Sequence, residues 1–170
     1  GNPESISNNS VLALVEDNEG ILWIGTEQGL NRFNPDSGRF TNYKSSIYAD
    51  GIGYNTIRAL LIDKQGTLWI GALHSGLYRY NKGTESFSKI IYHEPGDTHT
   101  NMNDISILYE SAPGIIWIGT TGKGLFKYNS MVDTFIHYTN VPGNPGSLCS
   151  DIIYSIGTDV NQDIWIGTNQ

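Results

Sequence analysis

The chain of 170 residues has a single cysteine, few charged residues and no apolar run long enough to cross a bilayer. One cysteine, Cys149, excludes an internal disulfide. Ten Lys and Arg residues stand against 17 Asp and Glu residues, which gives a net charge of −7. Nucleic acids and anionic membrane surfaces require basic patches, so we expect neither nucleic acid binding nor direct membrane contact. A neutral or cationic ligand fits this charge better.

Glycine and aromatic residues are abundant, and all four tryptophans occur in one recurring motif. The motif reads Leu-Trp-Ile-Gly-Thr or a close variant, and its copies occupy residues 22–26, 68–72, 116–120 and 164–168. Successive tryptophans stand 46, 48 and 48 residues apart. A fixed period in this range is typical of a propeller or a solenoid array.

The motif predicts a strand that is covered on both faces. Its tryptophan and glycine point to one side, and the flanking Leu or Ile residues point to the other. A strand without a polar face must lie between two other layers. We therefore expect the tryptophans to fill the space between neighbouring sheets and the glycines to permit close approach. These structural residues are Trp23, Trp69, Trp117, Trp165, Gly25, Gly71, Gly119 and Gly167.

A short turn precedes each tryptophan strand. Asp17 to Gly20 and Asp63 to Gly66 have Asp at the first position and Gly at the fourth, which predicts a type I turn with a side-chain hydrogen bond. The third copy replaces the acid with Ser111, and the fourth replaces the glycine with Gln162. We therefore interpret these residues as hairpin residues and not as catalytic ones. The strands before the turns are expected at 11–16, 57–62, 105–110 and 153–158.

Four strands in about 48 residues, joined by short hairpins and one long return, predict one blade of a β-propeller. The fold class is therefore all-β, a β-propeller fragment spanning 1–170 with three four-stranded blades plus the first two strands of a fourth. The blades are expected near 11–47, 57–95 and 105–140, and the half blade at 153–170. Three and a half blades cannot close a ring. We therefore expect apolar end faces that self-association, or the remaining blades of a longer chain, would cover.

The repeated pattern resembles a known family. Asp-x-x-Gly-x-Leu-Trp-Ile-Gly-Thr, then Gly-Leu-x-Arg-Tyr-Asn and a later Phe-x-x-Tyr, as found between Ile57 and Tyr92, is similar to the two-component regulator propeller repeat. Four in-phase copies extend the resemblance over nearly the whole chain. The sequence departs from the pattern at Ser111, Gln162 and Ala72, all of them structural positions.

This resemblance implies the periplasmic sensor region of an inner-membrane hybrid two-component histidine kinase. The kinase would lie outside these residues, so the chain itself would act in signal transduction without catalysis, cofactor or metal. Carbohydrate sensing is typical of such receptors, and an oligosaccharide is the implied ligand. Its binding would shift the geometry of a dimer and so bias the kinase.

The long connections between repeats differ from copy to copy, and variable loops on one face of a repeat array usually carry binding specificity. Saccharide binding uses aromatic faces and planar polar side chains. The candidate ligand-binding residues of these loops and the neighbouring turns are Tyr48, Asp50, Tyr54, His74, His93, Asp97, His99 and Lys123. The spacing of His93, Asp97 and His99 is irregular and has no match in the other repeats, so we expect no metal there.

Two enzymatic alternatives and one non-enzymatic alternative remain. The Asp-x-x-Gly-x-x-Trp turn resembles the Asp-box of sialidase propellers, but Arg32 and Arg79 occupy a repeated structural position instead of forming a catalytic cluster. A propeller lyase needs an acid–base pair that stands apart from the repeat pattern. A protein-interaction scaffold needs no such pair. We favour the sensor over the glycosidase, the lyase and the scaffold.

Overall fold

A computed structural model describes residues 5–43, 56–94 and 102–169. They form fourteen strands, in three four-stranded antiparallel sheets and one two-stranded sheet, with no helix long and apolar enough to cross a membrane. This confirms the predicted propeller fragment. In chain order the strands are β1 (Val11–Glu16), β2 (Leu22–Thr26), β3 (Gly29–Asn34) and β4 (Arg39–Tyr43) in blade 1; β5 (Ile57–Ile62), β6 (Leu68–Ala72), β7 (Gly76–Asn81) and β8 (Ser86–Ile90) in blade 2; β9 (Ile105–Ala112), β10 (Ile115–Thr120), β11 (Leu125–Asn129) and β12 (Thr134–Tyr138) in blade 3; and β13 (Ile153–Thr158) and β14 (Ile164–Thr168) in half blade 4.

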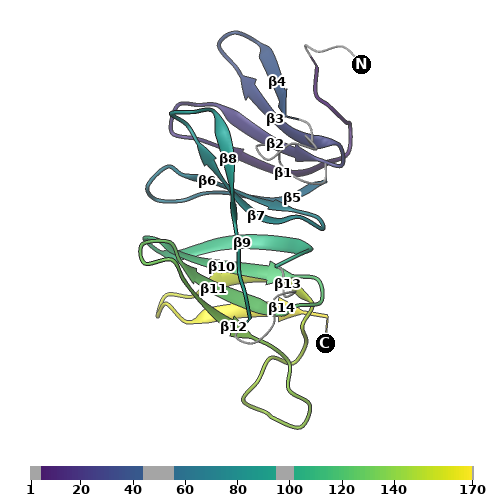
Figure 1. The fold of residues 1–170 in the computed structure, drawn as a ribbon, viewed down its shortest axis with the longest axis vertical. Helices are drawn as coiled ribbons and strands as arrows, with labels where there is room; N and C mark the ends of the chain where they lie inside the picture. Colours follow the sequence, from purple (N-terminus) through teal and green to yellow (C-terminus); the bar gives the residue numbers. More distant parts are fainter. Residues whose placement is uncertain (1–4, 44–55, 95–101, 170) are drawn as a thin grey trace.

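The blades follow one another along the long axis of the molecule, from β1–β4 near the N-terminus to β13–β14 near the C-terminus (Figure 1). In blades 1 to 3 the tryptophan strand pairs on both sides. Trp69, for example, lies opposite Leu61 of β5 and Arg79 of β7. In half blade 4, Trp165 lies opposite Gly157 of β13, and β14 has no second neighbour among the described strands.

Neighbouring blades meet where the motif glycines are. A Cβ atom on Gly25 would lie 2.8 Å from Cγ2 of Ile57 in the next blade, closer than real Cβ contacts occur. The same close approach recurs at 2.6 Å between Gly71 and Ile105 and at 2.7 Å between Gly119 and Ile153. The close approach expected at these three glycines is therefore confirmed. Each glycine faces the isoleucine that begins the first strand of the following blade, so neighbouring blades are aligned in the same way at all three junctions.

The core lies between the blades. Trp23, Trp69 and Trp117 are buried, and each belongs to a hydrophobic cluster that includes the first strand of the following blade. Trp69 contacts the ring of Tyr128 edge-on at 5.8 Å between centroids. The tryptophans fill the junctions as expected, because a buried indole supplies a large apolar area.

The two ends of the stack differ from its interior. Val11 and Leu14 of β1 are 48% and 58% exposed, whereas Ile57 and Leu60, at the same places in blade 2, are buried. At the other end, Trp165 is 66% exposed. The fourth tryptophan therefore does not fill a junction as predicted, since no described sheet follows β14.

The turns before the tryptophan strands also match their prediction in blades 1 and 2. The amide of Gly20 donates to the carbonyl of Asp17 at 3.0 Å, and the Asp17 side chain accepts from the amides of Glu19 and Ile21. Blade 3 differs, because β9 runs to Ala112 and not to the expected Glu110. Ala112 pairs with Ile115, which leaves a two-residue turn at Pro113 and Gly114. The strand therefore continues through Ser111, where the sequence departs from the repeat pattern.

Candidate ligand-binding site

Antiparallel order places the connections of each blade at two opposite ends. The turns between the second and third strands and the long connections to the next blade share one end. Of the eight candidate ligand-binding residues, His74, His93 and Lys123 lie there. Tyr48, Asp50, Tyr54, Asp97 and His99 lie outside the described residues.

His74 forms a contact between blades 2 and 3. Its Nδ1 lies 2.7 Å from Oδ1 of Asp104, and its backbone amide donates to the same oxygen at 3.1 Å. Both residues have positive φ angles, 60° and 59°, and the side chain of His74 is 59% exposed. The structure thus places His74 on a blade-to-blade link, and its role as a ligand residue stays a prediction.

His93 and Lys123 border two hollows that share Glu94 and His137. The first, about 510 Å³, includes His93, and the second, about 420 Å³, includes Lys123 and Asp151. Sequence reasoning did not identify Glu94 or His137. Two signals were present, since Glu94 belongs to a connection unlike those of the other repeats and His137 occupies a position held by Asn42 and Lys89 elsewhere.

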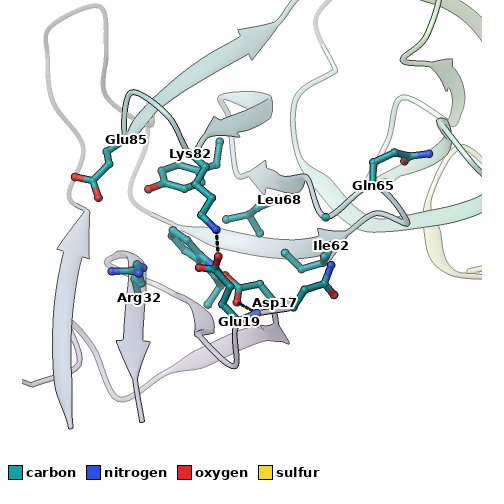
Figure 2. Close-up of a pocket in the computed structure, with 12 residues that line it drawn as sticks. Asp17, Glu19, Arg32, Ile62, Gln65, Leu68, Lys82 and Glu85 are labelled. Carbon is teal, nitrogen blue, oxygen red and sulfur yellow. Dashed lines mark hydrogen bonds and ion pairs between the residues drawn. The ribbon is translucent and has the colours of Figure 1, made fainter. Parts of the chain in front are cut away.

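At the other end of the blades, a cavity of about 440 Å³ opens between blades 1 and 2 (Figure 2). Blade 1 contributes its first turn and two strands, and blade 2 contributes three strands and two turns. The lining residues are Asp17, Asn18, Glu19, Trp23 and Arg32 from blade 1 and Ile62, Gln65, Gly66, Leu68, Tyr80, Lys82 and Glu85 from blade 2. None of the eight candidate residues is among them.

One ion pair crosses this cavity. Figure 2 shows Lys82 extended from the β7–β8 turn toward Glu19 on the first turn of blade 1, and the two side chains form an exposed ion pair. The turns themselves approach closely, because a Cβ atom on Gly66 would lie 3.2 Å from the side-chain nitrogen of Asn18. The cavity is therefore bounded by both blades, and its shape depends on the position of blade 1 relative to blade 2.

Asp17, the first residue of the turn before the tryptophan strand, has a structural role. Oδ2 of Asp17 accepts the indole N–H of Trp23 at 3.0 Å, while Oδ1 accepts two turn amides. These three hydrogen bonds join the turn to the tryptophan strand. Arg32 and Glu85 line the same cavity and take no part in these hydrogen bonds.

Aromatic side chains lie behind the cavity wall. Trp23 contacts Tyr80 at 4.8 Å and stacks on Tyr43 at 5.9 Å. Burial, followed by the neighbouring Tyr80, raises the pKa of Tyr43; Arg32 lowers it and Glu85 raises it. Tyr43 therefore stays a neutral hydroxyl in the physiological range.

Within the described ranges, no group of three or more His, Cys, Asp or Glu side chains could hold a metal ion. The polar side chains at the cavity are instead interspersed and of mixed charge. Such an arrangement can orient hydroxyl groups through several hydrogen bonds while rings and aliphatic groups contact the ligand body. Its volume lies within the range of ordinary small-molecule sites, roughly 300 to 1,000 Å³.

The comparisons with known proteins agree with the repeat pattern. The family model described as two component regulator propeller matches residues 5–28 and 51–74. No match to a curated protein was found.

Among solved structures, the extracellular domain of the proposed hybrid two-component system BT3049 from B. thetaiotaomicron is 30% identical, with a TM-score of 0.77. That of BT4673 from the same organism is 24% identical, with a TM-score of 0.79. The alignments cover 99% and 98% of this chain but 21% of each of those chains. Virginiamycin B lyase from Staphylococcus aureus, at 9% identity, a TM-score of 0.64 and coverage of 92% of this chain and 48% of its own, shares the fold.

Proposed function

We propose that this chain, which carries two-component regulator propeller repeats, is a non-catalytic sensor propeller of a hybrid two-component signalling receptor and lies in the periplasm. Support comes from the 30% identity to an extracellular domain of such a system over nearly the whole chain. Because the chain spans about a fifth of that relative, a histidine kinase and further blades would belong to other parts of the receptor.

We propose an oligosaccharide as the ligand and the cavity between blades 1 and 2 as its site. The observation that carries this proposal is the lining of that cavity, where Arg32, Glu85 and two amide side chains surround a space bounded by Leu68 and Tyr80. Planar polar groups can each bind two adjacent hydroxyls of a sugar, and the apolar groups contact its carbon face. The mixed charges favour a neutral ligand.

The position of the cavity suggests how binding would be transmitted. Its walls belong to two blades that Lys82 and Glu19 already connect. A ligand that binds one relative placement of the blades better than another shifts the population toward that placement. The end faces at Val11 and Trp165 would pass this change to further blades, or to a second copy of the chain, packed against them.

Binding is tested with the chain of 170 residues and a library of neutral, acidic and amino oligosaccharides. We expect at least one member to raise the melting temperature without being consumed. Arg32→Gln should abolish this shift, whereas Arg39→Gln, an exposed arginine of β4 outside the cavity, should preserve it.

Three results would contradict the proposal. Equal effects of Arg32→Gln and Arg39→Gln would exclude the cavity as the site. Turnover of a glycan, seen by mass spectrometry, would favour the glycosidase or lyase alternative. Tight binding of a polypeptide together with indifference to the whole library would favour an interaction scaffold.

A further inference from the structure

We propose that His137 is a pH-responsive clasp that holds the segment after β8 against blade 3 while its imidazole carries both protons. The clasp lies at the opposite end of the blades from the cavity of Figure 2, and the inference does not depend on the proposed ligand. It rests on the contacts of the two ring nitrogens.

Both nitrogens of His137 face oxygen acceptors. Nδ1 lies 2.8 Å from Oε2 of Glu94, and Nε2 lies 2.7 Å from the backbone carbonyl oxygen of Lys123. A neutral imidazole has one N–H, so its other nitrogen would direct a lone pair at an oxygen. A backbone carbonyl cannot donate in return. The geometry therefore matches the imidazolium, which donates at both positions.

The surroundings of His137 favour a cation. Its ring stacks on Phe126 with 4.0 Å between centroids and 2° between planes, and the side chain is 13% exposed. A cationic group over an aromatic face is attracted by the ring electrons. Glu94 adds a negative charge in direct contact, so removal of the proton from His137 would leave this partly buried carboxylate with a weaker partner.

The titratable groups that surround the clasp besides Glu94 are Tyr92, His93 and Asp133 in one hollow and Lys123 and Asp151 in the other. The hydroxyl of Tyr92 donates to the same Glu94 oxygen at 2.5 Å, and burial, together with the Glu94 carboxylate, raises the pKa of Tyr92. Tyr92 therefore remains a donor. The side chain of Lys123 is exposed, and Asp151, which lines the hollow beside His137, accepts the amide of Asn140 at 2.6 Å.

The equivalent positions in the other blades hold Asn42 and Lys89 and no histidine. In blade 1, Asn42 donates its side-chain amide to the carbonyl of Ser5 at 3.1 Å, which ties the outer strand to the segment that precedes the blade. In blade 2, Lys89 places its amine over the Tyr78 ring at 5.9 Å. Among these three positions, only His137 combines a hydrogen bond to a neighbouring segment with contact to an aromatic ring. Histidine is also the residue type whose charge changes between about pH 5 and 8.

The direction of the effect follows from the protonation state. The clasp is complete at mildly acidic pH and is lost as the pH rises and His137 releases a proton. We expect the protection factors of the amides of residues 92–94, corrected for intrinsic exchange, to fall roughly tenfold between pH 5.5 and 8, a change of the order that a charged hydrogen bond contributes.

The test combines nitrogen NMR of His137 with hydrogen exchange of the chain of 170 residues. The matched control is His137→Lys, which places the residue of blade 2 in the same position and keeps its charge over this pH range. We expect two protons on His137 at pH 5.5 and a protection of residues 92–94 that no longer depends on pH in His137→Lys.

A single proton on His137 at pH 5.5 would overturn the inference, and so would an equal pH dependence in the wild type and His137→Lys. Should His137→Lys fail to fold, Glu94→Gln replaces it, since removal of the carboxylate should reduce the pH dependence. Retention of the full wild-type dependence in Glu94→Gln would equally overturn the inference.

Discussion

The indole N–H of Trp69 donates to Oδ2 of Asp63 at 2.8 Å, and Oδ1 of the same carboxylate accepts the amides of Gln65 and Thr67. A single side chain thus fixes the turn and the tryptophan six residues later. The link recurs between Asp17 and Trp23 and between Asp159 and Trp165, and in blade 3 the hydroxyl of Ser111 replaces the carboxylate.

The first prediction concerns Asp63→Ala. This change leaves the buried indole N–H and two turn amides without their acceptor, so we expect a loss of about 2 to 4 kcal/mol in the free energy of unfolding. Denaturant unfolding followed by tryptophan fluorescence measures it. Asp159→Ala, at the exposed end of the stack, is the matched control and should have a much smaller effect; equal losses would contradict the structural role.

The second prediction compares two tryptophans of the same motif. Trp69→Ala removes a fully buried indole between two blades and should cost about 3 to 5 kcal/mol. Trp165→Ala removes an indole that is 66% exposed and should cost well under half of that. Thermal melting of both variants provides the comparison. A larger effect at Trp165 would show that its exposed face is covered in solution.

The third prediction concerns the close approach of neighbouring blades. Gly71→Ala would place a methyl group 2.6 Å from Cγ2 of Ile105 and 3.1 Å from Cβ of Ala59, so we expect a destabilisation of about 1 to 3 kcal/mol. Gly83→Ala is the control, because no atom lies within 4 Å of its added methyl group. Similar melting temperatures for the two variants would contradict the tight register at the junction.

The fourth prediction is a pH dependence at the C-terminal end. The hydrogen bond from Trp165, followed by that from the Asp163 amide, holds the pKa of Asp159 below its usual range. When the pKa of a carboxyl group is lower in the folded state, the group stabilises the fold. This stabilisation is fully present above the unfolded pKa of about 3.9 and is lost as the pH falls through the folded pKa. Acid titration of the Trp165 indole N–H resonance should report this loss, and Asp159→Asn should remove the titration.

Sequence reasoning predicted the fold because the residues that build it recur. Trp23 and Gly25 have counterparts in every repeat, so their pattern separates junction-forming residues from the rest. The hydrogen bond from each tryptophan to the turn was missed, although its six-residue spacing is constant. That spacing was interpreted as turn chemistry alone, and the contact requires the three-dimensional path of the hairpin.

The cavity and the clasp were not predicted, for a physical reason. Glu19 and Lys82 face each other across two blades and have no repeated counterpart, so no periodic signal marks either residue. Glu94 and His137 stand 43 residues apart and meet only because the segment after β8 passes the outer strand of the next blade. The candidate residues were instead chosen from variable loops.

The blades contact one another in series, with β5 lying between β1 and β9 and β9 between β5 and β13. In such an arrangement each unit gains stability from its intrinsic folding and from its immediate neighbours. Blade 2 has neighbours on both sides, whereas blade 1 and half blade 4 have one each among the described residues. Unfolding should therefore begin as fraying from the two termini, with the slowest amide exchange in the strands around Trp69 and several partly folded species at intermediate denaturant concentration.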